Sequence, residues 1–355
     1  MENGKPDLKA LSASKIKTLE SCSWLYWCNY SLKLPQTQND GARKGDICHR
    51  IFELLLNKKH LKKYKTIVKA GTITAVPSIE RIIKIYSKEI ELNLTPEVFL
   101  QIDEMILVGL KNDFFVKGAK LIQPEYKFDI FNAEPRYYIK GFMDKPYMAE
   151  KKIIIDDFKS SKKKFEGEDQ ESNIQAMIYS LAALKTWPDK SPTVRFIFLQ
   201  YPEDPLMELT FSEDALHGFE HYLAKIQERV DNFSERDAKR DFAYDKQAPK
   251  GGEFKGKLMC GFAKSPDQKK KDGTKMWHCP YKFPFNYWVV KDKDGNIKST
   301  TFDNKKIKLK EGEYIEEAFY SGCPKFNGEG NVLNNFEQVP VQQKKQDFSN
   351  VLDDF

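Results

Sequence analysis

Residues 153–159, Ile-Ile-Ile-Asp-Asp-Phe-Lys, constrain the fold of this chain more than any other stretch. A run of β-branched residues that ends in charged ones is typical of a buried strand reaching the edge of a sheet. Because side chains alternate along a strand, Asp157 and Lys159 are expected on one face. Asp156 and Phe158 then occupy the opposite face, with Phe158 in the core. The stretch therefore predicts a central strand that ends in a neighbouring carboxylate and lysine.

The segments around this strand predict an α/β fold. Runs of β-branched and aromatic residues predict two strands before it and one after it, at residues 123–132, 135–150 and 193–202. Apolar residues at helical spacing predict helices at residues 11–30, 41–60, 77–93, 96–112, 171–187 and 212–233. The order helix, three strands, helix, strand, helix in the middle of the chain favours a mixed central sheet flanked by helices.

Changes in composition divide the chain into four expected parts. Residues 1–120 form an N-terminal helical region, and residues 121–240 hold the strands of the core. Residues 241–340 contain repeated glycines, lysines and aspartates, which indicate an irregular C-terminal extension of linkers and hairpins. Residues 341–355 predict an exposed, flexible tail.

The composition excludes some classes of protein. With 40% hydrophobic and 13% aromatic residues, the chain is not expected to be disordered as a whole. No apolar run approaches the roughly 20 residues that span a bilayer, and the first residues lack a signal-peptide core. We therefore expect no membrane partner and a cytoplasmic protein, in the host cytoplasm if the chain is phage-encoded. The net charge of +6 permits a polyanionic partner without requiring one.

A second carboxylate is expected beside the strand end. Asp144 closes the preceding strand segment, so a simple hairpin would bring it next to Asp157 at one end of the sheet. Carboxylate oxygens bind Mg²⁺ or Mn²⁺, and a nearby lysine can orient water or neutralise a phosphoryl oxygen. An Asp-x-Lys triplet is also common at ordinary polar strand ends, which is the alternative interpretation.

Four further motifs accompany the Asp-Phe-Lys triplet in a fixed order. The set is Leu-Ser-Ala-Ser at 11–14, Gly-Asp-Ile-Cys-His at 45–49, Gly-Phe-Met-Asp at 141–144, Asp-Phe-Lys at 157–159 and Gln-Ala-Met-Ile-Tyr at 175–179. Together they resemble the RecB-like exonuclease branch of the PD-(D/E)xK nuclease superfamily, in a phage-type relative. The resemblance extends roughly from residue 11 to residue 202. It implies a restriction-endonuclease-like core and a Mg²⁺- or Mn²⁺-dependent deoxyribonuclease.

The resemblance also implies the roles of individual residues. His49, Asp144 and Asp157 would bind the metal together with a backbone carbonyl beside Asp157. Lys159 would activate or position the attacking water. A histidine on a helix is often only structural, and that alternative stays open for His49.

Four more residues would support this centre. Gln175 and Tyr179 lie four apart on one helix face, and the resemblance implies that they hold DNA and the catalytic lysine. Glu53, one turn after His49, would orient the imidazole. Glu125, one strand before Asp144, is an accessory acid.

The six cysteines are not expected to form a disulfide framework in a reducing compartment. Relatives of this branch often carry an iron–sulfur cluster, bound by one cysteine of the first helix and three near the C-terminus. The resemblance thus makes a [4Fe-4S] cluster possible here, with ligands Cys22, Cys260, Cys279 and Cys323. However, Lys282 stands where a further cysteine is expected. Zinc bound by His278 and the last three of these cysteines, or no metal at all, are the alternatives.

The end of the chain suggests a docking peptide. Phe348, Leu352 and Phe355 alternate with acidic residues, similar to the terminal peptides by which phage replication proteins bind sliding clamps. The likeness to the acidic tails of single-stranded-DNA-binding proteins is weaker, and a frayed end is the alternative.

Two functions from different classes are therefore expected. The first is a DNA nuclease, an exonuclease or a single-strand-directed enzyme, in phage or bacterial DNA replication, recombination or repair. The second is a non-catalytic DNA-binding replication accessory protein recruited through its tail. The presence of Asp144, Asp157 and Lys159 together favours the enzyme, because a site that no longer catalyses a reaction has no chemical reason to keep all three. RNA as the substrate is not excluded.

Overall fold

The computed structural model describes residues 8–245, 260–261 and 263–327. They divide into two compact units, which are described separately below. Residues 8–21 and 36–237 form the first unit, and residues 22–35 and those from 238 onward form the second. The expected tail, with Phe348, Leu352 and Phe355, lies outside the described residues. Within the described part of the chain, no helix has both the length and the apolar character that a membrane span requires.

A mixed five-stranded sheet forms the centre of the first unit, which confirms the expected fold class. The pair β5–β6 is parallel and the other neighbouring pairs are antiparallel. In sheet order, the strands are β1 (Lys120–Leu121), β4 (Lys145–Met148), β5 (Lys152–Lys159), β6 (Ser191–Phe198) and β7 (Leu206–Leu209). Since β5 is the middle strand and is paired on both sides, its side chains are well buried.

The sequence predicted one strand over residues 135–150. The structure instead has two strands there, and they belong to different sheets. β3 (Tyr137–Met143) pairs with β2 (Tyr126–Asn132) in a separate two-stranded sheet, whereas β4 pairs with β5. The chain changes sheets at Asp144, whose Oδ2 accepts a hydrogen bond from the Phe158 backbone N–H at 3.0 Å. This side-chain bond ties the junction to the end of β5.

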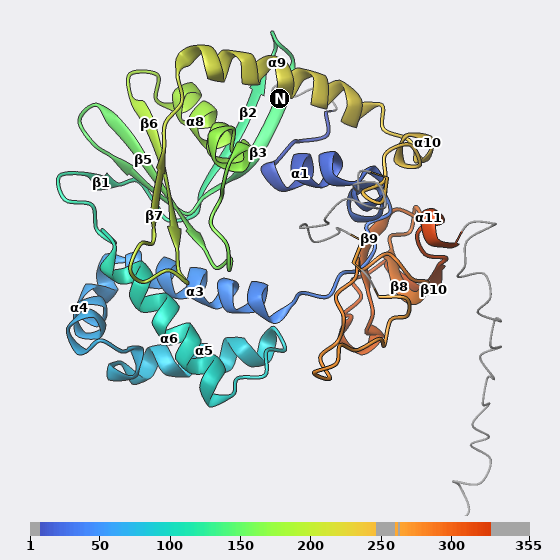
Figure 1. Ribbon diagram of the computed structural model, residues 1–355, viewed down its shortest axis with the longest axis horizontal. Helices are drawn as coiled ribbons and strands as arrows, with labels where there is room; N and C mark the ends of the chain where they lie inside the picture. Colours follow the sequence, from blue (N-terminus) through green and yellow to red (C-terminus); the bar gives the residue numbers. More distant parts are fainter. Residues whose placement is uncertain (1–7, 246–259, 262, 328–355) are drawn as a thin grey trace, which may run out of the picture. The chain divides into compact units, whose positions relative to one another are not determined.

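Helices cover the sheet of the first unit on both sides (Figure 1). One group packs its apolar residues around Phe158, Ile197 and Leu199 of the β5 and β6 segments. This group consists of α3 (Asp40–Leu56), α4 (Leu61–Ala70), α5 (Pro77–Glu89) and α6 (Pro96–Lys111). The other group consists of α1 (Ala13–Ser21), α8 (Ile174–Thr186) and α9 (Glu213–Asp231). Several begin at capping residues: Asn39 accepts from Ala42 N–H in α3, and Thr95 accepts from Val98 N–H before Pro96 in α6.

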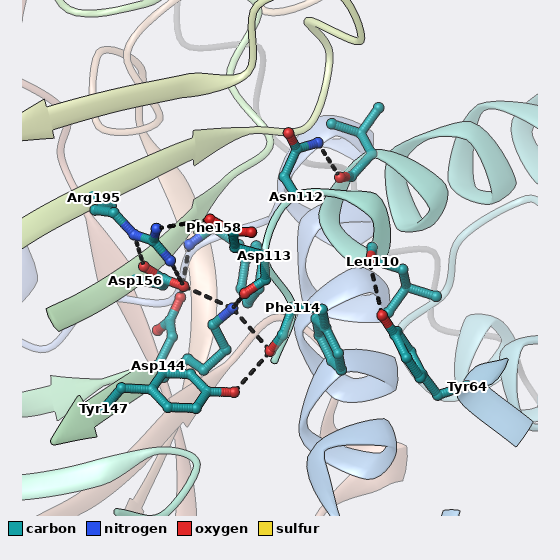
Figure 2. A network of polar contacts seen from close by, with 12 residues as sticks. Tyr64, Leu110, Asn112, Asp113, Phe114, Asp144, Tyr147, Asp156, Phe158 and Arg195 are labelled. Carbon is teal, nitrogen blue, oxygen red and sulfur yellow. Dashed lines mark hydrogen bonds and ion pairs between the residues drawn. The ribbon is translucent and has the colours of Figure 1, made fainter. Parts of the chain in front are cut away.

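A buried ionic network joins β4, β5 and β6 on the face opposite Lys159 (Figure 2). Asp156 and Lys145 are both fully buried, and Lys145 Nζ lies 2.7 Å from Asp156 Oδ2. Arg195 donates from Nε and Nη2 to the two Asp156 oxygens at 2.6 and 2.9 Å. Lys145 also donates to the carbonyls of Asp113 and Phe114. The network fixes the β4–β5 pair, in which Lys145 and Asp156 are register partners.

The second unit combines an N-terminal segment with the C-terminal part of the chain. The expected helix 11–30 breaks at Cys22, which is extended, with φ −162° and ψ 115°. Trp24 Nε1 donates to Tyr320 Oη at 2.8 Å and so attaches this segment to the C-terminal strands. Its elements include α2 (Ser23–Tyr26), a π-helix (Trp27–Ser31), β8 (Phe285–Lys291), β9 (Ile297–Thr301), β10 (Tyr314–Tyr320) and α11 (Pro324–Asn327). Two short helices, α7 (Glu168–Glu171) and α10 (Glu235–Ala238), lie elsewhere in the chain.

Candidate active site

A histidine and two carboxylates meet where β5 ends. His49 projects from α3, Glu125 precedes β2, and Asp144 lies between β3 and β4. One ligand atom from each of the three lies within 4.8 Å of the other two. His49 Nδ1 is 3.3 Å from Asp144 Oδ2, and His49 Nε2 is 3.1 Å from the Phe158 carbonyl oxygen. The sequence motifs had suggested Glu125 only as an accessory, whereas the structure places it within the cluster.

A second group of polar side chains adjoins the cluster on β5 and α8. Lys159 Nζ lies 2.6 Å from Asp157 Oδ2 and donates to Gln175 Oε1 at 2.7 Å. Gln175 Nε2 in turn donates to Asp157 Oδ1 and to Tyr179 Oη, both at 2.8 Å. Tyr179 donates to Asp157 Oδ1 at 3.0 Å. The four side chains therefore form one closed network, and Asn173, which caps α8 through Gln175 and Ala176 N–H, fixes the start of that helix.

Buried carboxylates lie close to one another in this site, and without a bound cation their repulsion is unfavourable. Burial, with the neighbouring charge of Asp157, raises the pKa of Asp144 to about 7, although His49 and the Phe158 N–H oppose this. Burial alone would lower the pKa of His49, but Asp144, Asp157 and Glu125 together raise it. Burial is also the main cause that raises the pKa of Glu125. Carboxylates gathered in this way repel one another, and a bound cation would relieve that repulsion.

The donor atoms of this site fit a divalent metal ion. Imidazole nitrogen and carboxylate oxygens are available from His49, Asp144 and Glu125. Asp157 Oδ2 contacts Lys159 but accepts no hydrogen bond of good geometry from the described residues. The carbonyl oxygen of Phe158, directly after Asp157, faces His49. Carboxylate and carbonyl oxygens suit hard divalent ions, and an imidazole nitrogen suits transition-metal ions.

The structure places Glu53 away from its expected partner. Its Oε2 lies 3.1 Å from Arg50 Nη1, one turn back on α3. Both ring nitrogens of His49 already have the partners described above. The orientation of the imidazole is thus explained by Asp144 and the Phe158 carbonyl.

Gly141 and Phe128 pack next to Tyr179 of the site, a contact that the sequence did not predict. A Cβ on Gly141 would lie 2.6 Å from the Phe128 ring, its register partner across β2–β3. That ring meets Tyr179 edge-on, with centroids 6.1 Å apart. A glycine inside a predicted strand indicates such a close approach, but it does not reveal which group approaches.

Five of the cysteines lie together in the second unit. Cys22 contributes to raising the pKa of Cys260, Cys279 and Cys323, and Cys260 and Cys279 contribute to raising that of Cys323, so these thiols lie close together. Burial, with a smaller contribution from neighbouring thiols, raises the pKa of Cys260 to about 11 and those of Cys279 and Cys323 to about 12. The fifth, Cys28, lies in the π-helix.

Lys282 lies beside these cysteines. It is 4% exposed and donates to the Gly261 carbonyl at 3.2 Å. Its pKa is lowered by burial, while the thiols of Cys260, Cys279 and Cys323 oppose that change. His278 is the residue that would bind zinc in the alternative interpretation. Its Nδ1 lies 3.3 Å from the Met276 carbonyl oxygen.

Comparison with known proteins identifies the family. None of the curated proteins compared with the chain matches it significantly. The sequence model of the PD-(D/E)XK nuclease superfamily matches residues 10–247, which include the whole site at the end of β5. The mixed sheet flanked by helices agrees with the fold of that superfamily. The chain therefore belongs to the PD-(D/E)XK nuclease superfamily.

Proposed function

We propose that the protein is a Mg²⁺- or Mn²⁺-dependent deoxyribonuclease, most simply an exonuclease, of DNA replication, recombination or repair. We also propose that it acts in the cytoplasm, the host's if the chain is phage-encoded. The observation that carries the proposal is the contact of Lys159 with Asp157 at 2.6 Å, beside the cluster of His49 and Asp144.

In this proposal His49, Asp144 and Asp157 hold the ion together with the Phe158 carbonyl, and Glu125 completes the set. A bound divalent ion supplies Lewis-acid polarisation of the phosphodiester and makes nearby water more acidic. The side chains of the protein position the reactants around it.

In this mechanism Lys159 acts on the attacking water and on the reacting phosphate. Asp157 and Gln175 hold its Nζ from two sides, so the ammonium group can fix the attacking water and neutralise charge on a phosphoryl oxygen. In-line attack breaks the bond to the 3′ oxygen and leaves a 5′-phosphate, with no covalent intermediate. Tyr179 and Gln175 keep Asp157 oriented through the bonds to its Oδ1.

The rival function, a non-catalytic DNA-binding accessory protein, explains the site less well. Burial and the charge of Asp157 raise the pKa of Asp144 to about 7, so keeping these acids together costs folding free energy. A protein that only binds DNA would gain nothing from that cost. Clustered groups with shifted pKa values are typical of catalytic sites.

Cleavage of end-labelled single- and double-stranded DNA in Mg²⁺ or Mn²⁺ tests the proposal. Asp157→Asn and Lys159→Ala should each abolish cleavage and leave DNA binding largely intact. Lys152→Ala, an exposed lysine at the other end of β5, is the matched control and should cleave normally. Wild-type turnover in either active-site variant would contradict the assignment, and cleavage of RNA but not DNA would change the substrate.

For the second unit, we propose a [4Fe-4S] cluster bound by Cys22, Cys260, Cys279 and Cys323. The mutual influence of these thiols supports it. In the described part of the chain, only the group at the end of β5 brings three ligand atoms within 4.8 Å of one another. The thiols are thus more widely spaced than a single zinc ion requires, and a four-iron cluster separates its ligands more widely.

From the sequence of the tail alone, we propose that Phe348, Leu352 and Phe355 dock to a sliding clamp or a single-stranded-DNA-binding protein. Short disordered segments bind in this way when a partner buries their apolar side chains.

A further inference from the structure

A cleft of about 300 Å³ lies directly beside the site at the end of β5. Its walls come from the start of α1, from β2 and β3, and from α8. Gln175 and Tyr179 belong both to the cleft wall and to the network around Asp157 and Lys159. A group bound in the cleft would therefore be a direct neighbour of the reacting phosphate.

Two lysines give the cleft a positive wall. Lys17 comes from α1 and Lys140 from β3, and among the described residues neither forms an ion pair. Lys17 Nζ lies 5.3 Å from the centre of the Phe165 ring, and burial lowers its pKa, while Asp169, Glu20 and Asp157 oppose that change. The charge of Lys140 contributes to lowering the pKa of Lys15, so these two lysines lie close enough to act on each other. Positive charge gathered in this way favours an anionic ligand.

Hydroxyl groups and an aromatic ring complete the walls. The hydroxyls of Ser12 and Ser14 lie 3.1 Å apart at the start of α1. Phe142 is 51% exposed and shares the outer face of β3 with Lys140. Single-stranded nucleic acids are bound by such combinations, in which lysines follow the phosphates and aromatic rings stack on the bases.

The size of the cleft bears on whether it receives single-stranded or double-stranded DNA. About 300 Å³ is at the low end of the range for small-ligand pockets, so the cleft suits one small group, such as a single base, better than a larger ligand. A base that enters must be unpaired, as in enzymes that extrude a nucleotide from the stack.

We propose that this cleft binds one unpaired nucleotide of DNA next to the scissile phosphate, with its base against Phe142 and its phosphate near Lys17 and Lys140. The inference rests on the proposed nuclease function and adds that the substrate strand is single-stranded at the site.

Binding of fluorescent oligothymidine to the cleavage-deficient Asp157→Asn protein tests this inference. In that background Phe142→Ala should weaken binding roughly 5- to 100-fold, as expected for one lost base stack. Phe131→Ala is the matched control, since Phe131 lies in the same hairpin, is 39% exposed and does not line the cleft. On a strand carrying abasic sites, Phe142→Ala should bind as the parent does. Equal weakening on the normal and abasic strands, or none on either, would overturn the stacking role.

The lysines are tested by salt dependence. For Lys17→Gln combined with Lys140→Gln, the slope of log affinity against log salt should fall by roughly 1.4, since each phosphate contact on a single strand contributes about 0.7. Lys152→Gln, at the far end of β5, should leave the slope unchanged. An unchanged slope in the double variant would overturn the phosphate role.

The outcomes separate this inference from the proposed function. If wild-type protein cleaves DNA but Phe142→Ala binds single strands normally, the cleft inference fails and the nuclease stands. If wild-type protein cleaves nothing in any metal while Phe142→Ala still loses affinity as stated, the binding site stands and the nuclease fails.

Discussion

Two adjacent aspartates on β5 should respond in opposite ways to the same substitution. Asp156→Asn should lower the free energy of unfolding by about 3–5 kcal/mol, the range for breaking a buried ion pair by removal of one partner. Asp157→Asn should change it by no more than about 1 kcal/mol while abolishing cleavage. The two residues are neighbours in the sequence, but they lie on opposite faces of the strand and contact different partners.

The magnitude for Asp156 follows from its contacts. Its carboxylate neutralises two buried cations, at 2.7 Å from Lys145 Nζ and at 2.6 and 2.9 Å from the Arg195 guanidinium. An asparagine leaves both charges uncompensated, although Arg195 keeps Asp113 at 3.3 Å. Asp157→Asn, in contrast, keeps an oxygen for Tyr179 and Gln175 and removes the repulsion with Asp144.

Urea unfolding followed by helix circular dichroism measures the effect, because the long helices α3, α5, α6, α8 and α9 belong to the first unit. With a slope of about 2–3 kcal/mol per M, Asp156→Asn should lower the midpoint by roughly 1–2 M. Asp113→Asn is the control, since the Asp113 side chain is 73% exposed and its ion pair contributes less than about 1 kcal/mol. A midpoint for Asp156→Asn equal to that of the wild type would refute the reasoning.

The remaining predictions concern four other parts of the chain. Gly141→Ala should lower the free energy of unfolding by about 1–3 kcal/mol through overpacking, and adding Phe128→Leu should restore part of that loss. If the shifts in melting temperature of the two single variants simply add in the double variant, this reasoning is contradicted. His49→Ala should lose cleavage at low Mn²⁺ and regain part of it at high Mn²⁺, whereas a loss indifferent to metal concentration would make His49 structural. Anaerobically purified protein should contain about four iron atoms per chain and Cys279→Ser far fewer; colourless, iron-free wild type would refute the cluster. Deleting residues 346–355 should leave cleavage of oligonucleotides unchanged but remove clamp or single-strand-binding-protein association, and lost catalysis without any partner would contradict docking.

The centre of the fold was predictable because β5 carries its own signal. Three isoleucines before the charges are typical of a buried strand, and strict alternation then separated Asp156 from Asp157. The predicted helix 96–112 agrees with α6 to within one residue, because preferences at a helix start act over only a few residues.

Features that depend on distant partners were not predictable. A lysine is rarely fully buried, so nothing near Lys145 indicated that Asp156 and Arg195 would enclose it. Glu125 adopts a left-handed conformation, with φ 50°, which is uncommon outside glycine and has no local signature here. The break of the first helix at Cys22 likewise depends on Trp24 meeting Tyr320, 296 residues further along.

The path of the chain through the two units has a consequence for its synthesis. Because residues 22–35 belong with the C-terminal part, ribosomes make the first piece of the second unit long before its partners. During synthesis Trp24 and Cys28 therefore lack their partner until Tyr320 has left the ribosome. Stopping the gene after residue 237 would leave that segment permanently without its partners, so a shortened nuclease needs residues 22–35 replaced by a polar linker as well.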